Sequence, residues 1–226
     1  MCVSTGKAGN PKTWTQHLKQ KGITVVHVVS SSKFALKAQE AGCDAIVAEG
    51  FEAGGHNGRE ETTTMVLVPV VVDAVTIPVI AAGGIAKGRQ MLAAMVMGAE
   101  GVQVGSRFVA SEEASSHSNF KNAIINAAEG DTHLSMKTLT PVRLLKNKFY
   151  EQVAAAENRG ATVEELKELL SRGRAKKGML EGNLEEGELE IGQASALLKE
   201  ILPAGEIVKN IWMEFNEGLR NPVKTI

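Results

Sequence analysis

The stretch "VIAAGGIAKGRQMLAAMVMGAEGVQVGSRF" (residues 79–108) decides the fold. It starts with a continuous apolar run, passes through Gly83 and Gly84 into a helix-length segment, and then repeats an apolar run that ends at Gly105 and Ser106. Continuous apolar runs are typical of strands buried on both faces of a parallel sheet. The stretch therefore predicts a strand–helix–strand unit with a glycine turn after each strand.

Similar apolar runs extend the pattern toward the N-terminus. The expected strands are residues 1–5, 23–29, 45–50, 78–83 and 101–106. The segments between them carry helix signals: one opens with Asn10 and Pro11 and ends at Gly22, and another opens on serines and ends at Gly42. This repetition predicts an α/β fold with a parallel sheet and right-handed crossovers.

The C-terminal half has a different character. From Ser116 onward we find helical and loop patterns and no further strand signal, with Thr162 and Glu165 forming a capping box. Residues 172–192 are glycine-rich and pass from basic to acidic, which favours a solvated loop over a flap above a ligand. We expect two parts, a partial (β/α) barrel at residues 1–115 and a helical region packing on it at residues 116–226.

Composition narrows the classes of function. The 226 residues are 43% apolar, enough for one sizeable core, and 25 basic residues nearly balance 26 acidic ones. No basic patch indicates nucleic acid or anionic lipid, so a small or neutral partner is expected. The two cysteines, Cys2 and Cys43, lack metal-ligand spacing, and no metal site is expected. Without an apolar run of about 18 residues or a signal peptide, we expect a cytoplasmic protein that does not enter a membrane.

The two glycine turns predict an anion site. Adjacent parallel strands bring Gly83, Gly84, Gly105 and Ser106 to the same carboxyl edge of the sheet, where main-chain amides and the Ser106 hydroxyl can bind one phosphate. The alternative is that each pair only makes a tight connection. Arg107 either adds charge there or faces water. No G-x-G-x-x-G fingerprint is present, so the phosphate of a mononucleotide is favoured over that of a dinucleotide.

A polar loop at residues 50–64 follows the third expected strand and carries His56. The glycines around this histidine are Gly54, Gly55 and Gly58. They free the backbone to orient an imidazole that can donate a hydrogen bond or act as a general acid or base near neutral pH. The alternative is a loop histidine that faces water.

Three further features bear on the same sheet edge. Glu49 ends a buried strand, where an unpaired carboxylate is costly, so we expect it to bond either a ligand or neighbouring amides. His27 lies on a strand and either lines the pocket or fills it. The threonines at 62–64 are expected to cap and start the next helix.

Together the motifs resemble a known family. "AIVAEGFEAGGHNG" (45–58), "IPVIAAGGIAKG" (77–88) and "GAEGVQVGSRF" (98–108) are similar, in this order, to the family that unites nitronate monooxygenases with flavin-dependent type II enoyl-acyl-carrier-protein reductases. The similarity resumes at residues 141–147 and 191–202. The resemblance implies a TIM-barrel type parallel sheet, and "MCVST" (1–5) matches the family's fourth strand. The first three βα units are therefore expected to be absent, as in a truncated chain.

The resemblance also implies the cofactor FMN and assigns site residues by motif position. His56 is implied to be catalytic, above the flavin ring. The residues implied to bind FMN are Glu49, Gly54, Gly55, Gly83, Gly84, Gln103, Val104, Gly105 and Ser106. No metal ligand is implied.

Two chemistries remain open within the family. One is the reduction of small or acyl-carrier-protein-bound enoyl thioesters, with NADH or NADPH as reductant; the other is the oxidation of alkyl nitronates with O₂. Glu49 favours reduction, because the monooxygenase branch often carries glutamine there and a carboxylate repels an anionic nitronate. A third hypothesis, of another class, is an inactive partial barrel that needs a partner chain, such as a second copy in a homodimer, because an open barrel edge favours association.

Overall fold

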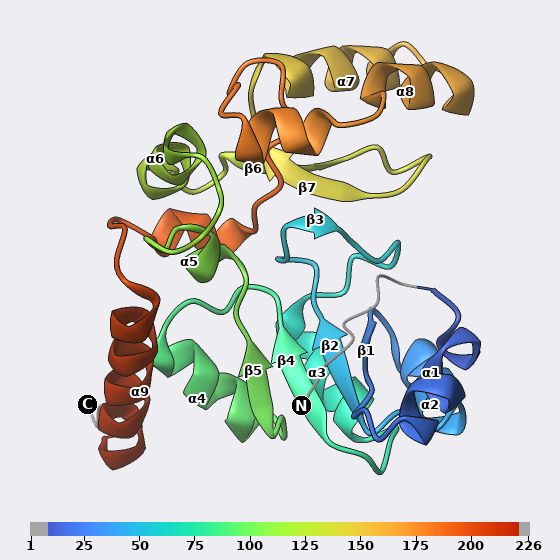
Figure 1. The fold of residues 1–226 in the computed structure, drawn as a ribbon, viewed down its shortest axis with the longest axis vertical. Coiled ribbons are helices and arrows are strands. Elements are labelled where there is room, and N and C mark those ends of the chain that lie inside the picture. Colours follow the sequence, from blue (N-terminus) through green and yellow to red (C-terminus); the bar gives the residue numbers. More distant parts are fainter. Residues whose placement is uncertain (1–8, 222–226) are drawn as a thin grey trace.

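A four-stranded parallel sheet forms the base of the molecule (Figure 1). This computed structural model describes residues 9–221, so the strand expected at residues 1–5 lies outside the described residues. The strands run in the order β1 (Val26–Val29), β2 (Ala45–Glu49), β4 (Val79–Ala82) and β5 (Gly101–Gln103). Each coincides with an expected apolar run. The prediction of an α/β fold with a TIM-barrel type parallel sheet is confirmed.

Helical segments lie before β1 and between the strands of the parallel sheet, at the positions that the sequence indicates. They are the short 3-10 turn Pro11–Thr13, α1 (Thr15–Gln20), α2 (Ser32–Glu40), α3 (Thr64–Val72) and α4 (Gly88–Val96). The side chains of Asn10 and Ser31 accept hydrogen bonds from the amides of Lys12 and Phe34, which caps the 3-10 turn and α2. Gly22 and Gly42 adopt positive φ angles of 72° and 88° beyond the helix ends.

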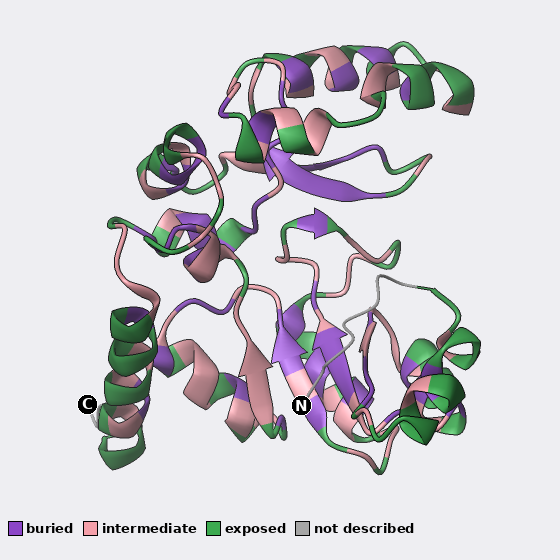
Figure 2. Ribbon diagram, in the orientation of Figure 1, coloured by how far each residue is buried: buried purple, intermediate pink, exposed green. Residues whose placement is uncertain are grey.

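The two faces of this sheet are covered to different extents. Figure 2 shows burial by residue, with β2 and β4 mostly buried and β5 intermediate throughout. Strand side chains such as Ile46, Ala48 and Ala81 are fully buried against α2 and α3. On the opposite face, Val47 and Ala82 are buried, whereas neighbours such as Ile80 are only partly so. Within the described residues, β1 and β5 each have one paired neighbour, so both strands form edges of the sheet.

A second, three-stranded antiparallel sheet lies above the first and corrects the expectation that no strand follows residue 106. Its strands are β3 (Gly55–His56), β7 (Val142–Leu145) and β6 (Thr132–Ser135), in that order. The sequence hid the hairpin because β6 and β7 are four residues long and contain polar side chains, including the buried Arg143. Their pairing with each other and with β3 stabilises segments that have little strand signal on their own.

The rest of the C-terminal region is largely helical. It comprises α5 (Ser106–Val109), α6 (Ser118–Asn126), α7 (Lys148–Asn158), α8 (Val163–Leu170), a π-helical turn (Lys176–Leu180), a 3-10 turn (Gln193–Leu197) and α9 (Ala204–Arg220). The capping box at α8 is present: the Glu165 amide donates to Thr162 Oγ1 at 3.2 Å, and the Thr162 amide donates to the Glu165 carboxylate at 2.7 Å. Among residues 9–221, no helix has the length and apolar character needed to cross a membrane.

The segment at residues 172–192 is more than the solvated loop that its composition favours. Gly178, Glu188 and Leu189 are buried, and the amide of Leu145 in β7 donates to the Leu189 carbonyl at 2.9 Å. Glycines allow this packing, because a Cβ at Gly178 would meet the main chain of residues 187 and 188. The end of the segment reaches the carboxyl edge of the parallel sheet.

Candidate active site

A row of three residues crosses the carboxyl edge of the parallel sheet. Glu49 of β2 is in register with Ala82 of β4, and Ala82 is in register with Gln103 of β5. Residues in register on neighbouring strands project to the same face, which here is the incompletely covered one. The first glycine turn begins directly after this row and the second begins one residue beyond it, as the sequence predicted.

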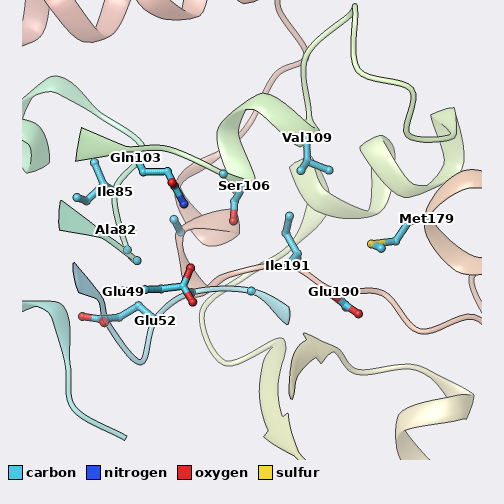
Figure 3. A pocket seen from close by; sticks show the side chains of 16 residues that line it. Glu49, Glu52, Ala82, Ile85, Gln103, Ser106, Val109, Met179, Glu190 and Ile191 are labelled. Carbon is cyan, nitrogen blue, oxygen red and sulfur yellow. The ribbon is translucent and has the colours of Figure 1, made fainter. Parts of the chain in front are cut away.

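A cavity of about 280 Å³ opens at this row. In Figure 3 the side chains of Glu49, Gln103 and Ser106 converge on it from β2, β5 and the start of α5. The other lining residues are Glu52, Ala53, Gly54, Ala82, Gly83, Gly84, Ile85, Gly105, Val109, Met179, Glu190, Ile191 and Ala194. The charged side chains among them are glutamates, so an anion here would be bound by main-chain amides and hydroxyl groups.

The first glycine turn is fixed by its neighbours. Gly83 and Gly84 have φ angles of 92° and 69°, in the left-handed region that favours glycine. A Cβ at Gly83 would also stand 2.8 Å from the Gly50 carbonyl oxygen. Gln90 of α4 holds the turn with its side-chain amide: it accepts from the amides of Ala86 and Lys87 at 2.9 and 3.1 Å, and donates to the Gly84 carbonyl.

The second turn leaves open space. A Cβ at Gly105 would find no atom within 4 Å, so packing does not explain the glycine. The amides of Phe108 and Val109 bond to the Gly105 carbonyl, which starts α5 at this point, and the first amides of a helix lack partners within it. Ser106 Oγ accepts a hydrogen bond of 3.1 Å from the Gly192 amide. A segment from the C-terminal region therefore closes this side of the cavity.

Glu52 was not singled out from the sequence, yet it joins three parts of the site. Its carboxylate accepts from the amide and hydroxyl of Thr64 at 2.9 and 2.8 Å, which caps α3. Its main-chain carbonyl accepts from the Gln193 amide at 2.9 Å. Thr63 is the N-cap residue without a side-chain cap bond, so Glu52 supplies the cap expected from the threonines. The only sign of this cap in the sequence is that a glutamate precedes three consecutive threonines.

Glu49 lies where the sequence predicted a buried carboxyl group. Among the described residues, no side chain or amide donates a hydrogen bond to its carboxyl group. Burial raises the pKa of Glu49 from 4.5 to about 7, because removal from water disfavours the charged form. Near neutral pH, protonated and ionised Glu49 are therefore both populated. The group is available to a ligand in the adjoining cavity.

A second, larger cavity of about 650 Å³ borders the first. It shares Glu49, Gly54, Gln103 and Glu190 with the first cavity. Its remaining lining residues are Gly9, Pro11, His27, Val28, Val29, Ser30, Phe34, Lys37, Gly55, His56, Asn57, Gly58, Arg59, Glu60 and Thr140. The predicted phosphate turns and the predicted catalytic histidine thus belong to two adjoining cavities, with Glu49 between them.

His56 is exposed to the second cavity on a short, paired strand rather than on a free loop. It lies in β3 and pairs with Val142 of β7. The Asn57 amide donates to the Pro141 carbonyl at 2.9 Å, which continues the same pairing. His27 lines the cavity from β1, and burial lowers its pKa. Of these two histidines, His56 is the one that the β6–β7 hairpin orients.

Three other predicted positions have roles that the sequence did not indicate. Gly54 lines both cavities, but a Cβ there would collide with the main chain of Ile191 and Gly192, so packing alone requires a glycine. Val104 packs in the core on the helix side and lines neither cavity. Arg107 neither lines a cavity nor faces water: it is 6% exposed and its Nη1 donates to the Glu200 carbonyl at 2.8 Å.

Comparison with known proteins agrees with this architecture. The chain is 33% identical over 216 residues to a probable nitronate monooxygenase of Staphylococcus saprophyticus, covering 91% of this chain and 60% of the relative. It is 42% identical to FabK from Thermotoga maritima, with a TM-score of 0.92 over 97% of this chain and 70% of that one. It is 28% identical to a nitroalkane oxidase from Streptomyces ansochromogenes, with a TM-score of 0.77 over 98% of this chain and 64% of that one.

The chain spans about 60% of the length of the Staphylococcus relative. The sequence model of the family described as Nitronate monooxygenase matches residues 1–214, which is most of the chain. The motifs that suggested this resemblance surround the two cavities. The chain therefore belongs to the nitronate monooxygenase family.

Proposed function

We propose that this chain acts as an FMN-dependent oxidoreductase that reduces enoyl thioesters. The observation that carries the proposal is the position of Glu49, a buried carboxyl group between a glycine-lined cavity and a cavity that contains His56. The first cavity offers a place for a phosphate and the second a place for a substrate.

The residues around the first cavity fit FMN. The space beside Gly105 is what a phosphate would fill, and the amides at Gly84, Gly105 and Ser106, with the Ser106 hydroxyl, would hold it. Glu49 and Gln103 would face the rest of the cofactor, since both line the two cavities. When bound, FMN supplies hydride transfer, with NADH or NADPH as the proposed reductant.

The side chains of this chain would bind and orient the substrate. His56, held on β3, would donate a hydrogen bond to the thioester carbonyl or supply a proton from its imidazole. Glu49 would donate a hydrogen bond when protonated and would repel anionic substrates when ionised. The second cavity, lined by residues of β1 and of the residue 50–64 loop, would hold the substrate.

Reduction and nitronate oxidation are supported by different observations. Identity is higher to FabK of Thermotoga maritima than to the nitroalkane oxidase, at 42% against 28%, so the likeness to the nitroalkane-oxidising relative is the weaker one. Glu49 also favours a neutral substrate. The family match and the Staphylococcus relative support nitronate oxidation as the second candidate function.

The test is a pair of assays on purified, FMN-reconstituted chain. One follows crotonyl thioester with NADH or NADPH under anaerobic conditions, and the other follows propyl-2-nitronate in air. We expect reduction of the thioester and weak or no nitronate oxidation. The reverse result would assign the chain to the second candidate. Protein that remains colourless after incubation with FMN would overturn both.

The open edges of the parallel sheet support a further proposal about assembly. Among the described residues, β1 and β5 each leave one side without a strand partner, and such edges favour association. If a strand partner at these edges is needed for flavin binding, we expect a homodimer or a complex with another chain. Light scattering of the flavin-bound protein tests it, and a monomer that retains FMN would contradict it.

A further inference from the structure

Arg143 is an unusual residue to find in the interior. It lies on β7, is 2% exposed and is the largest fully buried side chain of the described residues. Its Nε and Nη2 both donate to the carbonyl oxygen of Phe51, at 3.1 and 3.0 Å. Its guanidinium carbon also lies 4.4 Å from the centre of the Phe51 ring. The Arg143 side chain therefore contacts both the main chain and the side chain of Phe51, which lies 92 positions earlier in the sequence.

The main chain around Arg143 holds the same loop at a second point. Arg143 pairs with Gly55, and Val142 pairs with His56. Phe51 and Gly55 lie on either side of Gly54, which lines both cavities. The loop at residues 50–58 is therefore attached to β7 by a side chain before Gly54 and by a strand ladder after it.

Stability alone does not explain an arginine at this position. Burying a guanidinium group costs free energy, and a well-packed apolar side chain of similar volume often stabilises a fold as well or better. Burial lowers the pKa of Arg143, while the carboxylates of Glu52 and Glu61 oppose that effect. What an apolar residue would lack is the paired donation to the Phe51 carbonyl, which fixes the direction of the loop.

We propose that Arg143 is a positioning residue that, through the Phe51 carbonyl, holds the residue 50–58 loop so that His56 faces the second cavity. The inference rests on the proposed function for the role of His56. The proposed orientation itself is independent of which substrate is used, since it concerns the loop and not the bound molecule. Small misplacements of a catalytic group are costly, because a shift of about 1 Å lowers turnover by up to roughly 10².

Arg174 provides a matched control. Its guanidinium lies 5.0 Å from the ring of Phe149, and its Nη1 donates to the Glu186 carbonyl at 2.9 Å, so it too stacks on an aromatic ring and bonds a main-chain carbonyl. It also forms an ion pair with the Glu186 carboxylate at 3.3 Å. It lines neither cavity and does not touch residues 50–58 in any described contact. Arg174→Met thus removes a comparable stacked arginine elsewhere in the C-terminal region.

The first experiment measures hydrogen exchange of the whole chain by mass spectrometry. We expect Arg143→Met to raise exchange at residues 51–58 by roughly tenfold or more while exchange in β2 and β4 is unchanged, and Arg174→Met to leave residues 51–58 unchanged. Arg143→Lys, which keeps the charge but not the fork of donors, should lie between. Equal exchange at residues 51–58 in all variants overturns the proposal, whether or not the protein shows activity. If Arg143→Met fails to fold, the comparison is made with Arg143→Lys.

The second experiment is a double-mutant cycle with His56→Ala. At matched FMN occupancy, we expect Arg143→Met to lower kcat by roughly tenfold or more in the wild-type background and to have little further effect when His56 is absent. An equal fractional loss of kcat in both backgrounds would mean that Arg143 acts through overall stability and would overturn the proposal. Absence of turnover in the wild type would instead refute the proposed function, leaving hydrogen exchange as the test of Arg143.

Discussion

Glu49 and Gln103 face the same cavity from two strands that do not pair with each other. Each is in register with Ala82 of the intervening strand β4, so the parallel ladder sets their separation and direction. Ala82 carries only a methyl group, which leaves space between the two polar side chains. The chemistry expected at this row depends on the protonation state of Glu49.

Glu49 gives the first prediction, a pH dependence of stability. The pKa of Glu49 is raised by burial from 4.5 to about 7, so the folded state binds a proton more tightly than the unfolded state. Stability contributed by the protonated form is therefore present below about pH 4.5 and is lost as pH rises through about 7. We expect the free energy of unfolding to fall by roughly 2 to 3 kcal/mol from pH 5 to 8, relative to Glu49→Gln. Urea unfolding of the wild type and of Glu49→Gln at the two pH values measures this difference. If the free energy of unfolding changed with pH equally in both proteins, the prediction would be contradicted.

Gly105 gives a prediction that separates cofactor binding from folding. Its φ of −97° is accessible to any residue, and a Cβ there meets no atom within 4 Å. We therefore expect Gly105→Val to leave the melting temperature nearly unchanged while abolishing FMN binding, because the side chain fills the proposed phosphate position. Fluorescence titration with FMN measures the affinity. Gly54→Ala is the contrast, since it collides with main chain and should destabilise the fold itself. Retained flavin in Gly105→Val would make the turn purely structural.

Gln90 is expected to control the first glycine turn from outside the cavity. Its side chain bonds the amides of Ala86 and Lys87 and the carbonyl of Gly84. Replacement by leucine leaves these groups without their partner, which costs about 1 to 3 kcal/mol for a buried group. We expect Gln90→Leu to weaken FMN binding about tenfold and to lower the melting temperature. Calorimetric titration checks the affinity, and an unchanged affinity would show that the turn is held by its glycines alone.

His56 gives the prediction for turnover. We expect His56→Ala to retain FMN, because its side chain lies on the second cavity and not on the first. Thioester reduction should fall by roughly 10² or more, the usual contribution of a general acid or base. Steady-state kinetics with matched flavin content checks both statements. Wild-type turnover in the variant would remove His56 from the mechanism.

The parallel sheet could be predicted from the sequence because its strands are short runs of mostly apolar residues separated by helix signals, and because glycine turns follow β4 and β5. The positions of Gly83, Gly84 and Gly105 could be predicted in the same way, because the residues that form a turn lie next to one another in the sequence. Local signals also predicted the caps at Asn10 and Ser31. Such features depend on neighbours along the chain.

What the sequence could not indicate depends on distant partners. The strands of the hairpin β6–β7 are four residues long and are interrupted by polar side chains, and the hairpin pairs with His56, which lies far from it in the sequence. The burial of Arg143 could not be predicted, because its partner is the main-chain carbonyl of Phe51 and every residue has such a carbonyl. Gly192 closes the cavity onto Ser106 from a segment whose composition indicated a solvated loop. In each case a main-chain group supplies the partner.

The attachment of the residue 50–58 loop to β7 has a consequence for the order of events during synthesis. The sheet strands β1, β2, β4 and β5 are complete once residue 103 has left the ribosome, whereas Phe51 must wait for Arg143, 92 residues after it. At about 5 to 20 residues per second, that interval is roughly 5 to 20 s. A nascent chain can thus pair its strands early, yet the imidazole that faces the second cavity is oriented only when the hairpin has emerged.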